Sequence, residues 1–283
     1  MRQLFNGCVI GSILIFAYTP LGALAAPAAG LGTKVMPLAA HQAVYDLVLV
    51  PGAGPQSPAG ARGRIVYRFT GSRCTGYQSM YRQMTLIKPA DAATRLSDVV
   101  SDTFEDGDGK SFSFKVHSTI NDHTDQDIDG SAKVGVSGQV DVALQRPKPE
   151  QFGFKKEVLF PTGHIQHIIA AALAGQKTLS ARIYDGSDSG RKTYDTLTVI
   201  GKVKVGKAAN KVAQVGDLGT VPRWPVTVSY FDHDSHKDKP DYVLSFDLYQ
   251  NGISRHLKLD YGTFAFTGSL VNLKLLPLPA PCH

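Results

Sequence analysis

The sequence predicts a mainly β protein: one strongly curved antiparallel sheet, an open barrel of about 12–14 strands, with one helix packed on it. Apolar and polar residues alternate with period two over most of the chain after residue 40. Turn residues separate these runs, and only the segment 161–175 has helical periodicity. Because so many antiparallel strands twist and curl, we expect the helix to cover or plug the concave face.

The composition is that of a folded globular protein. The 283 residues are 43% hydrophobic and 19% charged, which excludes global disorder. The net charge is +6, and no lysine or arginine cluster makes a nucleic-acid-binding stripe, so we expect no nucleic-acid partner. Three cysteines are too few for a disulfide-dense scaffold or a four-cysteine zinc site.

Residues 1–25 are predicted to be a cleavable signal peptide. Arg2 supplies the positive start, an apolar run begins at Val9, and Ala23-Leu24-Ala25 is a small-x-small cleavage site. The alternative is a transmembrane anchor, but polar residues and Pro20 leave the run short for a span of about 20 residues. We therefore expect export, then a flexible linker over 26–40 and a single β domain over 41–283, peripheral to membranes at most.

Period-two runs place the strands of this domain. They cover 44–50, 63–69, 77–87, 111–116, 132–145, 178–184, 194–205, 225–231, 241–250, 253–260 and 263–275. Asn251-Gly252 gives the strongest hairpin signal, because a type I′ turn needs a positive φ at both central positions.

The segment 161–175 is predicted to be the helix, with Thr162 as its N-cap and Gly175 just past its end. Apolar residues at helical spacing form one stripe, namely Ile165, Ile168, Ile169, Ala172 and Leu173. The stripe is either core or the ligand-facing side of a lid.

Two cysteines remain after signal cleavage, since Cys8 leaves with the signal. An oxidising compartment and an even count favour a disulfide between Cys74 and Cys282, which would fasten a proline-rich tail to the body. The alternative is two unpaired thiols.

Two acidic segments resemble metal sites. Asp125–Gly130 begins like a calcium loop, but its twelfth position is Val136 instead of glutamate, so we expect an acidic turn. The segment 232–238 offers His233 and His236 with carboxylates as zinc ligands. It lies between two predicted strands, so a solvated connection is the better interpretation.

An acid–base set is the remaining chemical candidate. His164 and His167 share the first helical turn and would need Asp122, His123 or His117 beside them. Cap or rim positions fit these histidines better. The chain has no Gly-x-Ser-x-Gly elbow, phosphate-binding glycine loop or His-Glu-x-x-His motif. We therefore expect no enzyme, no catalytic residue, no metal and no cofactor.

Short motifs in a fixed order carry a resemblance to a known family. They are Tyr45-Asp46-Leu47, the run 63–69 leading to Cys74-Thr75-Gly76-Tyr77, the run 160–164, the run 184–190 with Tyr194-Asp195-Thr196, and the near-terminal Cys282. Together they resemble the envelope integrity protein B family of alphaproteobacteria. The resemblance implies a periplasmic β-spiral, pairing of Cys74 with Cys282, a role in envelope integrity and no established enzymatic activity.

Three functions are consistent with these observations. The leading one is a non-enzymatic periplasmic factor that maintains the cell envelope through protein or lipid contacts of its curved sheet. The alternative is a periplasmic lipid or lipoprotein carrier with the 162–174 helix as lid, which would need a pocket of roughly several hundred Å³ behind the helix. A hydrolase using the histidines ranks lowest.

Overall fold

The computed structural model describes residues 36–50, 57–155, 158–207, 211–235 and 238–277, all within the unit Val35–His283. The strands are β1 (His41–Val50), β2 (Gly60–Ser72), β3 (Gly76–Lys88), β4 (Arg95–Glu105), β5 (Ser111–Ile120), β6 (His123–Val134), β7 (Val140–Arg146), β8 (Glu150–Phe154), β9 (Thr178–Ile183), β10 (Tyr194–Ile200), β11 (Arg223–Asp232), β12 (Tyr242–Tyr249), β13 (Ser254–Asp260) and β14 (Ala265–Leu275). The helix is α1 (Pro161–Leu173), and the 3-10 turns are η1 (Asp188–Gly190), η2 (Lys211–Gln214) and η3 (Gly216–Gly219).

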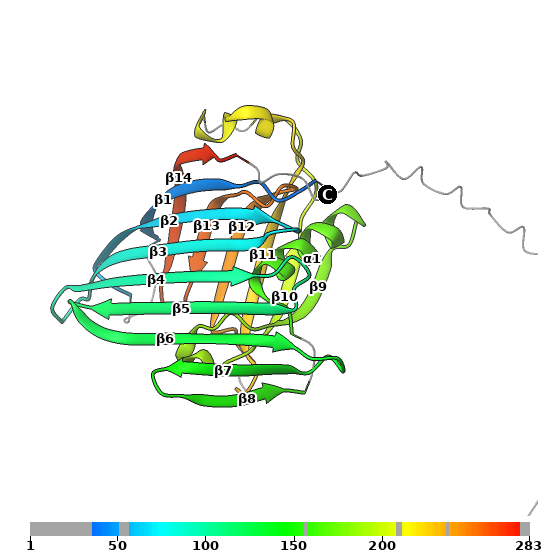
Figure 1. Ribbon diagram of the computed structural model, residues 1–283. Coiled ribbons are helices and arrows are strands. Elements are labelled where there is room, and N and C mark those ends of the chain that lie inside the picture. The colour runs from blue at the N-terminus through cyan, green and yellow to red at the C-terminus, as the bar shows by residue number, and fades with distance from the viewer. Residues whose placement is uncertain (1–35, 51–56, 156–157, 208–210, 236–237, 278–283) are drawn as a thin grey trace, which may run out of the picture. The chain divides into compact units, whose positions relative to one another are not determined.

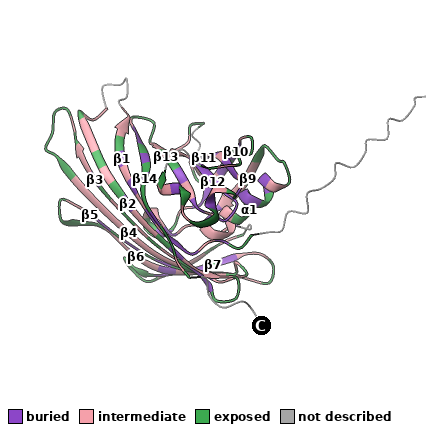
Figure 2. Cartoon of the chain, turned by 90° about the horizontal axis from the view of Figure 1, so that it is seen from above, coloured by how far each residue is buried: buried purple, intermediate pink, exposed green. Residues whose placement is uncertain are grey.

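These fourteen strands form one antiparallel sheet in the order β8-β7-β6-β5-β4-β3-β2-β1-β14-β13-β12-β11-β10-β9. Strands that follow one another in sequence pair with each other, except β8 with β9, and β1 pairs with β14 in the middle of the order. The edges are β8 and β9, and the chain passes from one to the other through α1. The sheet is strongly curved and does not close into a barrel, which confirms the predicted fold class (Figures 1 and 2).

The helix lies inside the curve, between β2–β3 on one side and β9–β12 on the other (Figures 1 and 2). Its residues share a hydrophobic cluster with Phe69, Tyr77, Trp224 and Leu248. A second cluster joins β1, β13 and β14 to η2 and η3, and a third fills β5–β8 around Phe160 and Tyr184. The two halves of the sheet are therefore joined through apolar packing as well as through the β1–β14 pairing.

Some strands differ from the prediction. β4 and β8 have no predicted counterpart, the run 132–145 is a hairpin of β6 and β7, and β10 ends at Ile200. β4 was not predicted because its residues on the core side are largely polar. Ser97, Ser101 and Thr103 lie opposite core-facing residues of β5, so apolar and polar residues do not alternate clearly along β4. The prediction of an acidic turn at Asp125–Gly130 is also wrong, because this segment is part of a strand.

That acidic segment lies inside β6, where aspartates alternate with residues of the buried face. Ile128 is buried, whereas Asp127 and Asp129 face away and accept hydrogen bonds from Arg146 at 2.9 and 3.3 Å. Cross-strand pairing with a cation lets carboxylates occupy the outer face of a strand. The acidic residues therefore belong to a charged outer surface of the sheet.

The predicted hairpin at Asn251-Gly252 is confirmed between β12 and β13, but its type I′ geometry is wrong. Only Gly252 has a positive φ, of 84°, and its N–H donates to the carbonyl of Tyr249 at 2.9 Å. The β5–β6 turn has two successive positive φ values instead, 49° at Asn121 and 63° at Asp122. Side-chain polarity lets asparagine and aspartate adopt this conformation without glycine.

Both ends of α1 bear on the predictions. Gly175 has φ of 76°, and the N–H groups of Gly175 and Gln176 donate to Ala172 and Ala171, which confirms the predicted stop as a Schellman motif. At the other end Phe160 is the N-cap, so the assignment of this role to Thr162 is wrong.

The predicted flexible linker over 26–40 is wrong at its end, because Leu38 and Ala40 are buried in the body.

Candidate functional site around helix α1

A carboxylate from the sheet caps the N-terminus of α1. Glu105, the last residue of β4, accepts hydrogen bonds from the N–H groups of Thr162 (2.8 Å, to Oε2) and Gly163 (2.9 Å, to Oε1). Its side chain is buried, and burial raises its pKa, against which the hydrogen bonds from Thr162 and Gly163 act. A negative charge at this end of the helix also meets the positive end of its dipole. The contact ties the helix to the first half of the sheet.

Phe160 fixes the entry to α1 by apolar packing. Its ring stacks on that of Phe112 in β5 with centroids 5.0 Å apart, and only 1% of the residue is exposed. Leu159, just before it, forms a parallel bridge with Ile183 at the end of β9. The helix therefore begins from a segment held between β5 and the edge strand β9, next to Glu105, which caps its first turn.

His164 is buried on the opposite side of the first turn. Its Nε2 lies 3.5 Å from the hydroxyl of Thr196 on β10, and 3% of the residue is exposed. Burial, and secondarily the charge of His167, lowers the pKa of His164 to about 4. The imidazole is therefore neutral at pH 7 and removed from solvent, which suits a core position better than acid–base work.

The other predicted acid–base partners are not brought to His164. His167 is exposed, and its Nδ1 lies 2.8 Å from the carbonyl of Gly163 in its own helix. His117 faces Asp127 across β5 and β6 at 3.9 Å, while Asp122 and His123 are exposed at the turn between those strands. The set expected from the sequence is thus dispersed over separate parts of the sheet.

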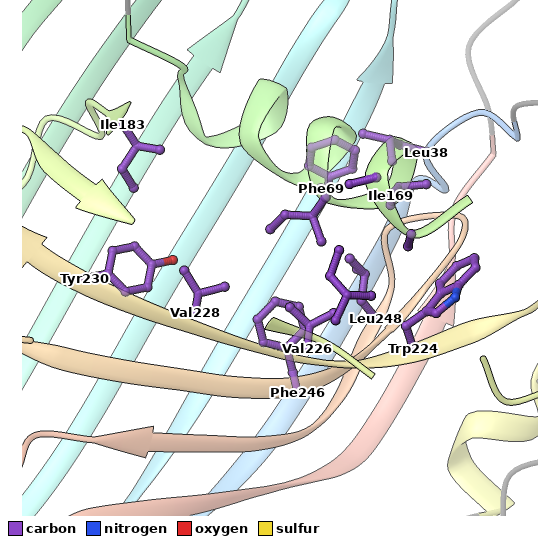
Figure 3. Close-up of a cluster of buried hydrophobic side chains, with 14 of the residues drawn as sticks. Leu38, Phe69, Ile169, Ile183, Trp224, Val226, Val228, Tyr230, Phe246 and Leu248 are labelled. Atoms are coloured by element: carbon purple, nitrogen blue, oxygen red, sulfur yellow. The ribbon is translucent and has the colours of Figure 1, made fainter. Parts of the chain in front are cut away.

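The apolar stripe of α1 packs into the core. Ile168, Ile169 and Ala172 are buried, and Ile165 and Leu173 are half-buried against the same cluster. Figure 3 shows Ile169 above the side chains of Val226 and Leu248, near Phe69 and Leu38. In this arrangement the stripe contributes to the stability of the fold, and its role as the inner side of a lid stays a prediction.

A small cavity adjoins the first turn of α1. Its volume is about 90 Å³, close to that of three water molecules. Apolar side chains and the polar groups of five residues line it together, the latter being His41, Tyr67, Ser79, Thr162 and Asn251. An acyl chain needs a pocket of roughly several hundred Å³, so this cavity is too small to be the ligand pocket of a carrier.

The segment 232–238, expected to be a solvated connection with zinc binding as the alternative, places His233 beside Asp195. His233 Nδ1 lies 2.7 Å from Asp195, whose carboxylate also accepts a hydrogen bond from Arg182 at 2.8 Å, and His236 lies outside the described residues. Burial acts to raise the pKa of Asp195, but the hydrogen bonds from Arg182 and His233 outweigh burial, so the pKa is lowered. Asp195 and Arg182 line a shallow open hollow of about 540 Å³ over β9 and β10. Within the described parts of the chain, no group of three or more metal-ligating side chains is found.

Sequence reasoning missed Glu105, the residue that positions the helix. It lies 57 residues before Thr162 in the chain. One signal was available, because the first turn of α1 contains no acidic residue and its N-cap Phe160 has no capping side chain. A helix start of that kind needs its N–H groups paired from elsewhere in the fold.

The predicted disulfide lies partly outside the described residues. Cys74 is exposed in the turn between β2 and β3, and Cys282 is not among the described residues, so the pairing stays a prediction. Among the residues that the structure describes, no helix is long and apolar enough to span a membrane.

Comparisons with known proteins agree along nearly the whole described chain. A family model described as EipB-like matches residues 33–277. The cell envelope integrity protein EipB of Brucella abortus (strain 2308) is 35% identical over 255 residues, which are 90% of this chain and 89% of that protein. A crystal structure of a beta-barrel-like protein of a domain of unknown function, also from Brucella abortus, matches with a TM-score of 0.79 and 34% identity, covering 85% of this chain and 99% of that one.

Proposed function

The chain belongs to the EipB-like family, and from this we propose that it maintains the integrity of the cell envelope as a non-enzymatic factor in the periplasm. One observation carries the proposal: a relative named for cell envelope integrity is 35% identical along 89% of its own length. The family resemblance of the sequence motifs points the same way, and the signal peptide predicted over residues 1–25 supports a periplasmic location.

The surroundings of the histidines support a non-enzymatic role. His164 is buried and neutral at pH 7, and His233 is held by Asp195 on the outside of the sheet. The hydroxyl beside His164 is that of Thr196, which donates a hydrogen bond to the carbonyl of Ala181 at 2.9 Å within the sheet. We propose that the curved sheet, kept in shape by α1 and Glu105, acts through contacts with a protein or lipid of the envelope.

A deletion strain tests this proposal. Loss of the gene should increase sensitivity to detergent and to cell-wall antibiotics, and the full chain should restore resistance. A chain without residues 1–25 should fail to restore it, because the protein would not be exported. A deletion strain with unchanged sensitivity would contradict the proposed role, and rescue by the truncated chain would contradict the periplasmic location.

The non-enzymatic part has its own test. His164→Gln and His233→Gln should both restore resistance, since neither substitution removes a catalytic group. Folding is checked by circular dichroism in each case. A folded variant that fails to complement would favour the hydrolase hypothesis instead.

The carrier alternative requires α1 to leave the core, because the cavity beside it holds only about 90 Å³. Mass spectrometry of gently purified protein distinguishes the two functions. A stoichiometric copurified lipid would favour the carrier, and its consistent absence favours the contact-based role.

A further inference from the structure

The connection between β10 and β11 carries a concentrated positive charge. Residues 201–216 contain four lysines, Lys202, Lys204, Lys207 and Lys211, and no aspartate or glutamate, in a chain whose whole net charge is +6. All four lysines are exposed. Figure 1 shows this connection projecting beyond the end of β14.

Most of this charge is not neutralised by the rest of the fold. Lys204 Nζ lies 3.5 Å from Asp247 Oδ1. For Lys202, Lys207 and Lys211, no ion pair is found within the described part of the chain. The segment therefore presents unpaired cations to any anionic surface that approaches it.

Two aliphatic side chains lie among these lysines. The exposed fractions of Val203 and Val205 are 54% and 67%, high for residues of this type. The backbone of Lys204 pairs with that of Arg223 at 2.7 and 3.0 Å, and its side chain turns toward Asp247. Because side chains alternate along extended backbone, Val203 and Val205 point together to the other side.

The described parts of the connection are anchored to the body despite their exposure. Ala213, Leu218 and Val221, which follow the lysines, are buried in the cluster that also contains Tyr249 and Leu273. The guanidinium of Arg223 donates to the carbonyl of Gly206 at 2.8 Å. Residues 202–207 and Lys211, here called the Lys/Val strip, therefore lie next to anchored residues, so binding would order little additional chain there.

We propose that the Lys/Val strip docks the protein on an anionic lipid bilayer. Val203 and Val205 enter the headgroup layer while the exposed, unpaired Lys207 and Lys211 contact lipid phosphates. Exposed aliphatic side chains in a lysine-rich segment are the combination that peripheral membrane segments use. The partner is identified by charge complementarity to the strip and by the solvent-facing valines. The inference goes beyond the envelope role proposed above and does not involve α1.

Vesicle cosedimentation with the purified exported protein tests the proposal. Vesicles of phosphatidylcholine with about one-third phosphatidylglycerol should bind the protein at low ionic strength, and pure phosphatidylcholine should not. Each lysine near an anionic surface strengthens binding roughly fivefold, so Lys207→Gln/Lys211→Gln should weaken it about 25-fold. Val203→Ser/Val205→Ser should weaken it roughly tenfold through lost apolar insertion.

The matched control is Lys110→Gln/Lys133→Gln, which removes the same charge from exposed positions far from the strip, one just before β5 and one in β6. This variant should bind as the unmodified protein does. Absence of binding to anionic vesicles, equal binding to neutral ones, or equal losses for the strip and control variants would each overturn the proposal. If the strip variants instead lose binding only to an acidic envelope protein, that protein is the partner and the bilayer proposal is refuted. Vesicle binding is measured apart from the deletion phenotype, so either proposal can fail alone.

Discussion

Replacing Glu105 with alanine would separate the first turn of α1 from the sheet. The substitution removes the carboxylate that accepts hydrogen bonds from the N–H groups of Thr162 and Gly163. The truncated side chain leaves these donors in a buried environment where water does not readily replace the carboxylate.

The expected loss of stability follows from these contacts. A buried N–H left unpaired costs about 1–3 kcal/mol, and the loss of a helix cap about 0.5–2 kcal/mol. Part of this is offset, because burial raises the pKa of Glu105 and the ionised carboxylate is itself costly to bury. We therefore expect Glu105→Ala to lower the free energy of unfolding by about 2–4 kcal/mol at pH 7. The free energy of unfolding of Glu105→Gln should lie between those of the unmodified protein and Glu105→Ala, because an amide presents only one acceptor oxygen to the two N–H donors.

Urea denaturation followed by circular dichroism measures this difference, and hydrogen exchange locates it. Protection should fall first at the amides of Thr162 and Gly163 and then through α1. Asp46→Ala is the control, since its ion pair with Arg64 lies on the surface, with side chains 42% and 60% exposed, and should contribute little to stability. If Glu105→Ala costs no more than Asp46→Ala, or if exchange at α1 is unchanged, the capping argument is wrong.

Four further outcomes are expected. Ile168→Ala should cost about 2–5 kcal/mol in urea denaturation because Ile168 is fully buried, whereas Leu197→Ala, at a 43% exposed position, should cost less than about 1 kcal/mol; similar losses would contradict the core assignment. The pKa of His164 is about 4 in the folded state and near 6.5 unfolded, so the unfolded chain binds the proton more readily and stability should fall by about 3 kcal/mol as the pH drops from 6.5 to 4. His164→Gln should remove that part of the pH dependence, and an unchanged slope would refute it. Gly186→Ala should cost about 3 kcal/mol or more, because its Cβ would lie 2.4 Å from the ring of Phe114, whereas Gly138→Ala, also at positive φ but with open space around it, should cost about 1 kcal/mol. Finally, a thiol assay on the exported protein should find no reactive thiol before reduction and two after it if Cys74 and Cys282 pair; two reactive thiols at the outset would exclude the bond.

Much of the secondary structure could be predicted from local sequence patterns. In most strands the buried face is apolar and the outer face polar, so alternation revealed the strand even where its ends were misplaced. The helix was equally visible, since Ile168, Ile169 and Ala172 recur at helical spacing. β4 was hidden because serine and threonine occupy its core-side positions.

The candidate site was predicted less well than the fold. The sequence indicated a helix with two histidines and an apolar stripe, but the carboxylate that caps it comes from β4. The spacing of His164 and His167 said that they share a turn, yet one is buried against Thr196 and the other is exposed. Burial depends on what the rest of the chain places beside a residue, which a one-dimensional pattern does not contain.

The amino-acid sequence by itself therefore determined the β class, the helix α1 with its stop at Gly175, and the family to which the chain belongs. These features follow from residues that are neighbours in the chain or from motifs along it. Only the tertiary structure decided that β1 pairs with β14, that β8 and β9 remain the open edges, and that Glu105 caps a helix 57 residues away. Such contacts form when distant segments meet as the sheet curls, and no local periodicity encodes which of them will meet.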